Sequence, residues 1–292
     1  LNYRMQDMDN ALKNWLHALT LVEEFDDKLK MSKYTNNIGI WYYQDDDYSK
    51  SIEYYEKSLA IKEELKDTRN MGKTLNNLGE VYFDMGDFTS SIEMFNESIK
   101  IKEKLNDNKG RVSSLFNRGK TFFFDQNYEN AINDFRASAT IADIDENTQK
   151  SNRFIGMSHF YLANHDSSIW YLEECYDYYT ETKDLRKHLS VLPFLIISYN
   201  KVKDTKSSDK ALNSFNEIIA EEDPYPPDYI MTYWIAYEAL KSVNNEEEAG
   251  EYLENAYLEL KTQSKNIKNK KDRNKFLKTK FHQEIVKSFK QS

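Results

Sequence analysis

Four glycines recur at a nearly constant interval, and this interval constrains the fold more than any other feature of the sequence. Gly39, Gly79, Gly119 and Gly156 are spaced by 40, 40 and 37 residues, and they make up half of the 8 glycines in a chain of 292 residues. A fixed period of this length is the signature of a repeat protein, in which one supersecondary unit is stacked many times. We therefore expect stacked copies of a single structural unit.

A second pattern of residue sizes accompanies each glycine. Twelve residues after it comes a small residue, four further on a large one, and three beyond that another small one. The three positions are occupied by Ser51, Tyr55, Ser58; Ser91, Phe95, Ser98; Ala131, Phe135, Ser138; and Ser168, Leu172, Cys175. Small residues let two helices approach closely, and the large residue fills the gap between them. Turn-forming residues at 44–47 and 85–87 separate the two halves, so each unit is predicted to be a helical hairpin.

The pattern resembles that of the tetratricopeptide repeat family, with a period near 40 residues, similar to kinesin light chains and peptide-sensing bacterial regulators. The fit covers four clear repeats over residues 32–180, within an array that spans residues 1–260. A truncated first repeat precedes them, and two degenerate repeats occupy residues 186–260. The resemblance implies an all-α, right-handed superhelix of about seven helical hairpins, buried by stacking on one another.

The degenerate repeats carry two irregular segments. In the sixth unit a lengthened turn is expected from Lys203 to Asp209, between Tyr199 and Ala211. Three prolines in residues 221–227 forbid a helix there. We expect an extended connection at this point that acts as a rigid spacer, with a hinge or a partner-docking strip as the alternative.

The composition argues against an enzyme. Only 8 Gly and 4 Pro are present, too few for the tight turns of a β-sandwich or the glycine loops of a dinucleotide fold. The 5 histidines show no metal-ligand spacing, and no nucleophile elbow or phosphate-binding loop occurs. His159 is expected to be packed in a repeat, His165 to be exposed in a turn, and the single cysteine, Cys175, to be a buried inert thiol. We expect no catalytic residue, no metal and no cofactor.

Localisation is only weakly indicated. No signal peptide is visible and no apolar run approaches the length of a membrane helix, so a cytoplasmic location is expected. The chain begins at Leu1 rather than Met, which suggests that an N-terminal segment is missing.

The resemblance also implies a binding surface, because the first helix of each repeat lines the concave side in this family. Asn37, Asn77 and Asn117 occupy one register, and an amide that both donates and accepts can hold a peptide backbone. Aromatic residues that recur at another position of the repeat, here called the aromatic file, can accommodate ligand side chains. The candidate peptide-binding residues are Asn36, Asn37, Tyr43, Asn76, Asn77, Glu80, Phe83, Asn117, Lys120, Phe123, Arg153 and Phe160.

Two further readings concern this surface. The asparagines can instead bridge adjacent helices, with no role in binding. The basic clamp that chaperone-binding members use is incomplete here, because Ser113 and Phe154 occupy two of its basic positions. The mixture of Glu80, Lys120 and Arg153 therefore predicts a ligand of mixed charge.

Charge divides the chain at residue 260. The formal net charge of −9 is the sum of −18 over residues 1–260 and +9 over residues 261–292. Leu277, Phe281, Ile285 and Phe289 recur every four residues, so the tail is predicted to be a basic amphipathic helix that caps the array and docks on it electrostatically. The tail is also similar to the segment that closes repeat arrays in multidomain bacterial signalling proteins. A membrane or nucleic-acid arm is the less favoured alternative.

These features together predict a non-enzymatic module that binds a peptide or protein segment in its concave groove, with no nucleic acid or membrane partner. The first alternative is a ligand-sensing regulatory region of a larger bacterial signalling protein, such as a cyclase, kinase or transcription regulator. The second is a self-assembling scaffold, in which Phe123, Phe124, Phe160 and Tyr161 contact a second copy to form a homo-oligomer.

Overall fold

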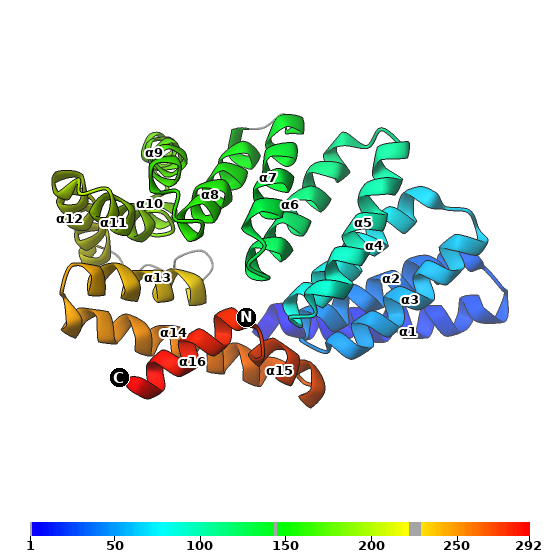
Figure 1. The fold of residues 1–292 in the computed structure, drawn as a ribbon. Helices are drawn as coiled ribbons and strands as arrows, with labels where there is room; N and C mark the ends of the chain where they lie inside the picture. Colours follow the sequence, from blue (N-terminus) through cyan, green and yellow to red (C-terminus); the bar gives the residue numbers. More distant parts are fainter. Residues whose placement is uncertain (1, 143–144, 222–228) are drawn as a thin grey trace. The chain divides into compact units, whose positions relative to one another are not determined.

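The computed structural model describes residues 2–142, 145–221 and 229–292, and the regular secondary structure of this part of the chain is entirely helical. The expected all-α fold of helical hairpins is confirmed (Figure 1). The helices group into two compact units. Unit 1 comprises residues 1–121 and 264–278, and unit 2 comprises residues 122–263 and 279–292.

Unit 1 is built mainly from long helices that follow one another along the chain. They are α1 (Asn2–Glu24), α2 (Lys28–Gln44), α3 (Tyr48–Glu64), α4 (Thr68–Asp84), α5 (Phe88–Lys104), most of α6 (Asn108–Phe124), and the later α15 (Lys270–Leu277). Helices α2 and α3 pack against each other as one hairpin, and α4 and α5 as the next.

Unit 2 repeats the arrangement with less regular helices. Its members are α7 (Tyr128–Ile141), α8 (Asp145–Tyr161), α9 (His165–Glu181), α10 (Leu185–His188), α11 (Leu192–Lys201), α12 (Thr205–Glu221), α13 (Tyr229–Ser242), most of α14 (Glu246–Asn266), and α16 (Lys280–Gln291). Helix α8 pairs with α9, and α11 pairs with α12.

A turn that recurs every twenty residues sets the period of unit 1. At α2 the chain leaves the helix through Asp46, whose φ of 56° is left-handed, and enters α3 at the N-cap Asp47. The Asp46 N–H donates to the Tyr43 carbonyl and the Asp47 N–H to the Tyr42 carbonyl, which is the Schellman closure of a helix end. The Asp47 carboxylate then accepts a hydrogen bond from the Lys50 N–H. Helices of 17 residues and turns of three give twenty residues per helix and 40 per hairpin.

The glycine ladder marks the points where the paired helices touch, as the spacing predicts. A Cβ atom at Gly79 would lie 2.6 Å from Cε1 of Phe95, and one at Gly156 would lie 2.7 Å from Cγ of Leu172. Both large side chains are fully buried. The residue sixteen positions after each of these glycines therefore fills the space that the missing side chain leaves.

The small residues of the pattern contribute hydrogen bonds as well as close approach. The Ser51 hydroxyl donates to the Gly39 carbonyl at 2.9 Å, and the Ser91 hydroxyl donates to the Gly79 carbonyl at 2.8 Å. All four residues are buried. A buried hydroxyl has to be paired to avoid a desolvation penalty, and the neighbouring helix backbone supplies the acceptor here.

The sixth hairpin departs from the regular form in its first half. Pro193 lies in the first turn of α11, where its missing N–H costs no helical hydrogen bond, and the preceding helix α10 stops at His188. The lengthened turn expected from Lys203 to Asp209 is wrong: α12 already begins at Thr205, because the Asp204 side chain accepts from the Ser207 N–H at 3.1 Å and caps the helix. The proline-rich segment 221–227 lies outside the described residues apart from the last helical residue of α12.

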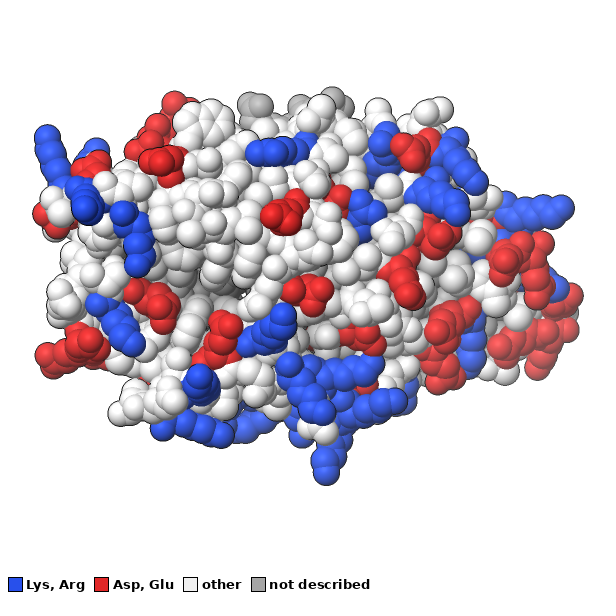
Figure 2. Space-filling view, in the orientation of Figure 1, with Lys and Arg blue, Asp and Glu red and all other residues white. Residues whose placement is uncertain are grey.

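The basic tail is divided over three helices rather than forming one, because α14 continues to Asn266 and is followed by α15 and α16. Lys and Arg side chains gather over α15 (Figure 2). Within unit 1, Lys275 pairs with Asp87 at 2.5 Å and Lys268 pairs with Asp45, so the expected electrostatic docking on the acidic array is present. Asp272, which is buried, accepts a hydrogen bond from the Ser49 hydroxyl at 2.7 Å.

Helix α16 carries the apolar stripe of the tail within unit 2. Ile285 is fully buried, Phe281 contacts Phe124 edge to face at 5.8 Å, and Phe289 stacks on Tyr257 at 4.0 Å. These contacts bury apolar surface of the last helices, which is the role expected of a capping segment.

Deleting residues 265–292 should lower the melting temperature, because it removes both the ion pairs of α15 and the buried stripe of α16. The loss should be larger at 20 mM than at 500 mM NaCl, since salt screens the ion pairs but not the apolar contacts. Calorimetry of the full chain and the deletion at the two salt concentrations measures this. A deletion that leaves the melting temperature unchanged at both would show that the tail adds no stability.

The cysteine and histidine side chains with possible chemical roles are packed against neighbouring residues. The Cys175 thiol is buried, and burial raises its pKa to about 12, so it is a poor nucleophile, as predicted. His159 stacks on Tyr171 at 5.8 Å, and burial lowers its pKa. His165, expected to be exposed, is instead half-buried against Phe160.

Two searches of the described residues gave no result. No group of three or more His, Cys, Asp or Glu side chains in that part of the chain is arranged to hold a metal ion. None of its helices combines the length and the apolar character needed to cross a membrane.

Candidate functional site

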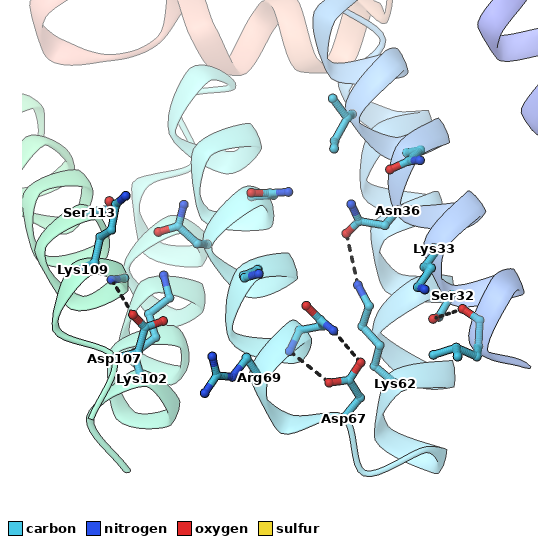
Figure 3. A pocket seen from close by; sticks show the side chains of 18 residues that line it. Ser32, Lys33, Asn36, Lys62, Asp67, Arg69, Lys102, Asp107, Lys109 and Ser113 are labelled. Atoms are coloured by element: carbon cyan, nitrogen blue, oxygen red, sulfur yellow. Dashed lines mark hydrogen bonds between the residues drawn. The ribbon is translucent and has the colours of Figure 1, made fainter. Parts of the chain in front are cut away.

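A polar groove of about 820 Å³ opens on unit 1 along the helices that begin each hairpin (Figure 3). Helices α2, α4 and α6 supply most of its wall, and the ends of α3 and α5 close it from behind. Its lining includes Lys33, Asn36, Asn37, Ile40, Lys62, Asp67, Arg69, Lys73, Asn76, Asn77, Lys102, Asp107, Lys109 and Gly110. The groove therefore contains a row of amides and a set of cationic side chains.

The charge of this groove is opposite to that of the array around it. Six cationic side chains and two carboxylates line it, although residues 1–260 carry a net charge of −18. The two carboxylates, Asp67 and Asp107, are engaged in capping helices. Asp67 accepts from the side chain of Asn70 at 2.7 Å, and Asp107 accepts from the backbone N–H of Gly110 at 2.9 Å. The sequence-based expectation of a mixed-charge ligand did not anticipate this excess of cations.

Two of the cations are buried and held in equivalent networks one repeat apart. Lys62 reaches from α3 and donates to Thr74 Oγ1 at 2.6 Å and to Asn36 Oδ1 at 3.2 Å (Figure 3). Lys102 reaches from α5 and donates to Ser114 Oγ at 2.7 Å, and Ser114 in turn donates to the side-chain oxygen of Asn76 at 2.6 Å. Burial lowers the pKa of both lysines to about 8. Both ammonium groups thus lie at the base of the groove with neutral acceptors.

The asparagines predicted to bind a peptide differ in their surroundings. Asn36 and Asn76 accept the hydrogen bonds just described, and the Asn117 amide donates to Glu80 Oε1 at 2.7 Å. Asn77 lies near the Tyr55 hydroxyl of α3 and acts to lower its pKa against the effect of burial. Asn36, Asn76 and Asn117 thus bridge neighbouring helices, as the alternative reading of the sequence proposed. Asn37 lines the groove and makes no side-chain hydrogen bond with any described residue.

Two half-buried carboxyl groups, those of Glu80 and Asp84, lie beyond the groove on α4. Asn76 also donates to Glu80, at 2.8 Å, and the Tyr43 hydroxyl donates to Asp84 Oδ2 at 2.5 Å. Burial raises the pKa of both carboxyls. Lys120 lies 5.0 Å from the centre of the Phe83 ring. The candidate residues Tyr43, Glu80, Phe83 and Lys120 are thus engaged with one another or with Asp84, and they do not line the groove.

The remaining three candidates belong to unit 2, where they take part in packing. Phe123 is 4% exposed and contacts Phe154 and Tyr161, among other rings. Arg153 lies over the Phe154 ring at 4.9 Å, and Phe160 contacts Phe194 at 5.1 Å. The aromatic file predicted to accommodate ligand side chains is, at Phe123, part of the core.

The sequence reasoning missed the two buried lysines because it considered only the first helix of each hairpin. The signal was available: Lys62 and Lys102 are 40 residues apart, the same interval as Gly39 and Gly79. A lysine that recurs in register with the core glycines belongs to the repeat rather than to a variable surface.

Comparisons with known proteins agree with this architecture. The family model described as Tetratricopeptide repeat matches residues 1–64 and 70–143. Over these residues the chain is similar to the tetratricopeptide repeat family, and its hairpins have a long period of 40 residues. No curated protein sequence matched the chain.

Solved structures show the same fold at low sequence identity. The apo form of RapI is 15% identical and has a TM-score of 0.69, over 89% of this chain and 99% of that chain. The apo form of the quorum sensor NprR from B. thuringiensis is 15% identical, with a TM-score of 0.64 over 86% and 71% of the two chains. The Rap conjugation gene regulator of the plasmid pLS20, in complex with a Phr peptide, is 15% identical, with a TM-score of 0.56 over 91% and 76%.

Proposed function

We propose that this chain is a non-enzymatic binding module that holds a peptide or protein segment in the groove of unit 1. The observation that carries the proposal is Asn37, an amide that lines the groove and has no side-chain hydrogen-bond partner among the described residues. An extended peptide offers a carbonyl and an N–H that such an amide can pair with. Ile40, one turn further along α2, adds an apolar contact in the same groove.

The similar structures support the same function. One of them was solved in complex with a Phr peptide, and another is a quorum sensor. They also favour a ligand-sensing regulatory region as the second candidate, and hydrogen exchange that changes outside the groove when a peptide binds would support it. The self-assembly alternative loses one of its four proposed contact residues, because Phe123 is buried within unit 2.

A random peptide library displayed on phage, selected on the purified chain, provides ligands for the test. Replacing Asn37 by alanine should lower the affinity for the selected peptides about five- to tenfold, which corresponds to the loss of one hydrogen bond of about 1 kcal/mol. Folding should be unaffected, since the Asn37 side chain bonds to no described residue. Calorimetric titration measures the affinity.

The matched control is Asn10→Ala, which removes an exposed asparagine of α1 outside the groove. The Asn10→Ala variant should bind the selected peptides with the same affinity as the unmodified chain. Selection that yields no specific peptide, or peptides that bind the Asn37→Ala variant as well as the unmodified chain, would contradict the groove as the binding site.

A further inference from the structure

The two buried ammonium groups at the base of the groove form no ion pair with a described residue. Lys62 and Lys102 are 5% and 4% exposed. No carboxylate among the described residues lies within ion-pair distance of either one. A buried charge is normally paired, because removing it from water without an opposite charge is costly. The repeated placement of such a lysine in two successive hairpins therefore requires a reason beyond packing.

Both groups keep hydrogen-bonding capacity that the protein does not use. An ammonium group has three N–H donors. Lys62 donates to two acceptors, Thr74 and Asn36, and Lys102 to one, Ser114, among the described residues. At least one N–H on each lysine is available to a group that enters the groove.

The rim of the groove repeats this excess of positive charge. Lys33, Arg69, Lys73 and Lys109 line it, are exposed, and form no ion pair with any described residue. Among the described residues the lining contains two carboxylates, Asp67 and Asp107, and both accept hydrogen bonds at helix N-termini. The groove thus presents cations at two depths, and although Asp67 and Asp107 act electrostatically on Lys62 and Lys102, neither carboxylate forms an ion pair with them.

We propose that the groove takes an acidic peptide segment, whose Asp or Glu carboxylates enter and serve as the counter-ions of Lys62 and Lys102. This inference rests on the proposed function and specifies its ligand. The carboxylate accepts from the spare ammonium N–H, while Lys33 and Lys73 at the rim attract the segment as it approaches.

Two observations favour a peptide over a nucleic acid. The described residues of the lining include no aromatic side chain on which a base would stack, and stacking is a main source of affinity for single strands. The array outside the groove is acidic, which repels a long polyphosphate but tolerates a short segment held inside the groove. The amide of Asn37 beside the cations fits a peptide backbone.

The test uses three fluorescent probes of equal length, namely hexaglutamate, hexaglutamine and a six-nucleotide oligothymidylate, with anisotropy as the readout. Hexaglutamate should bind at least tenfold more tightly than hexaglutamine and more tightly than the oligonucleotide. Lys62→Met and Lys102→Met should each weaken the binding of hexaglutamate roughly tenfold or more, because each removes a buried partner of a carboxylate. Methionine is of similar length and apolar, so circular dichroism should show unchanged helicity.

Lys57→Met and Lys104→Met are the matched controls, since they remove exposed lysines from the same two helices, α3 and α5, outside the groove. They should change hexaglutamate binding less than twofold. Equal binding of hexaglutamate and hexaglutamine, unchanged binding in both buried-lysine variants, or tighter binding of the oligonucleotide would overturn the inference. Library peptides that lose affinity on Asn37→Ala but carry no acidic residues would leave the groove as the binding site and reject the acidic ligand alone.

Discussion

Replacing Gly79 by alanine should destabilise unit 1 by about 1–3 kcal/mol, although alanine is the better helix former. In an open helix position the same change stabilises by about 0.5–1 kcal/mol. At Gly79 the added Cβ would lie 2.6–2.8 Å from three atoms of the Phe95 ring. Phe95 is fully buried, so its rigid ring has no room to move away. The steric term therefore outweighs the gain in helix propensity.

Gly250 in α14 provides the control, because nothing lies within 4 Å of a Cβ atom built there. Gly250→Ala should raise stability by up to about 1 kcal/mol. Urea denaturation followed by circular dichroism measures both variants. In a Phe95→Leu background the cost of Gly79→Ala should shrink, because the two residues share the same space. A Gly79→Ala variant as stable as the unmodified chain would show that the helices separate easily at this point.

The contacts between paired helices can be predicted from the sequence, because the residues that pack between the helices recur at a fixed interval. Gly79 and Phe95 are sixteen residues apart, and that interval alone places them on facing sides of a hairpin. What the period cannot supply is the polar partner of each buried group. Ser91 was predicted as a small residue, and the structure shows that its hydroxyl also bonds to the Gly79 carbonyl. Size can be read from one residue, whereas a hydrogen bond depends on the neighbouring helix.

The candidate site shows the same limit more strongly. Asn37 and Asn117 occupy one register, so the sequence treats them as equivalent. In the structure the Asn117 amide donates to Glu80 on α4, whereas the Asn37 side chain has no hydrogen-bond partner among the described residues. The two amides therefore differ because of a residue on another helix. The prediction of a peptide groove placed the amides on the first helix of each hairpin, where the structure has them, but could not say which of them is available to a ligand.

The variant in which Lys62 and Lys102 are both replaced by methionine should be more stable than the unmodified chain at pH 7, and this difference should close as the pH rises to about 10. Burial lowers the pKa of each lysine to about 8, against an ordinary value of 10.5. Between these values the unfolded chain binds more protons than the folded chain, so the stability of the unmodified protein increases with pH. The penalty is complete below pH 8 and absent above pH 10.5.

The size of the effect follows from the same shift and is on the order of 3 kcal/mol for each lysine below pH 8. Methionine carries no charge and removes the penalty, and the acceptors keep partners, since the Thr74 hydroxyl donates to Asn36 at 3.0 Å and Ser114 donates to Asn76. Urea denaturation at pH 7 and pH 10 measures the difference, with the Lys57→Met, Lys104→Met double variant as the exposed control. A double variant of the buried lysines that is less stable than the unmodified chain at pH 7 would mean that these lysines stabilise the fold. A stability gain at pH 7 together with loss of hexaglutamate binding would instead mean that the protein keeps two destabilising charges because the ligand requires them.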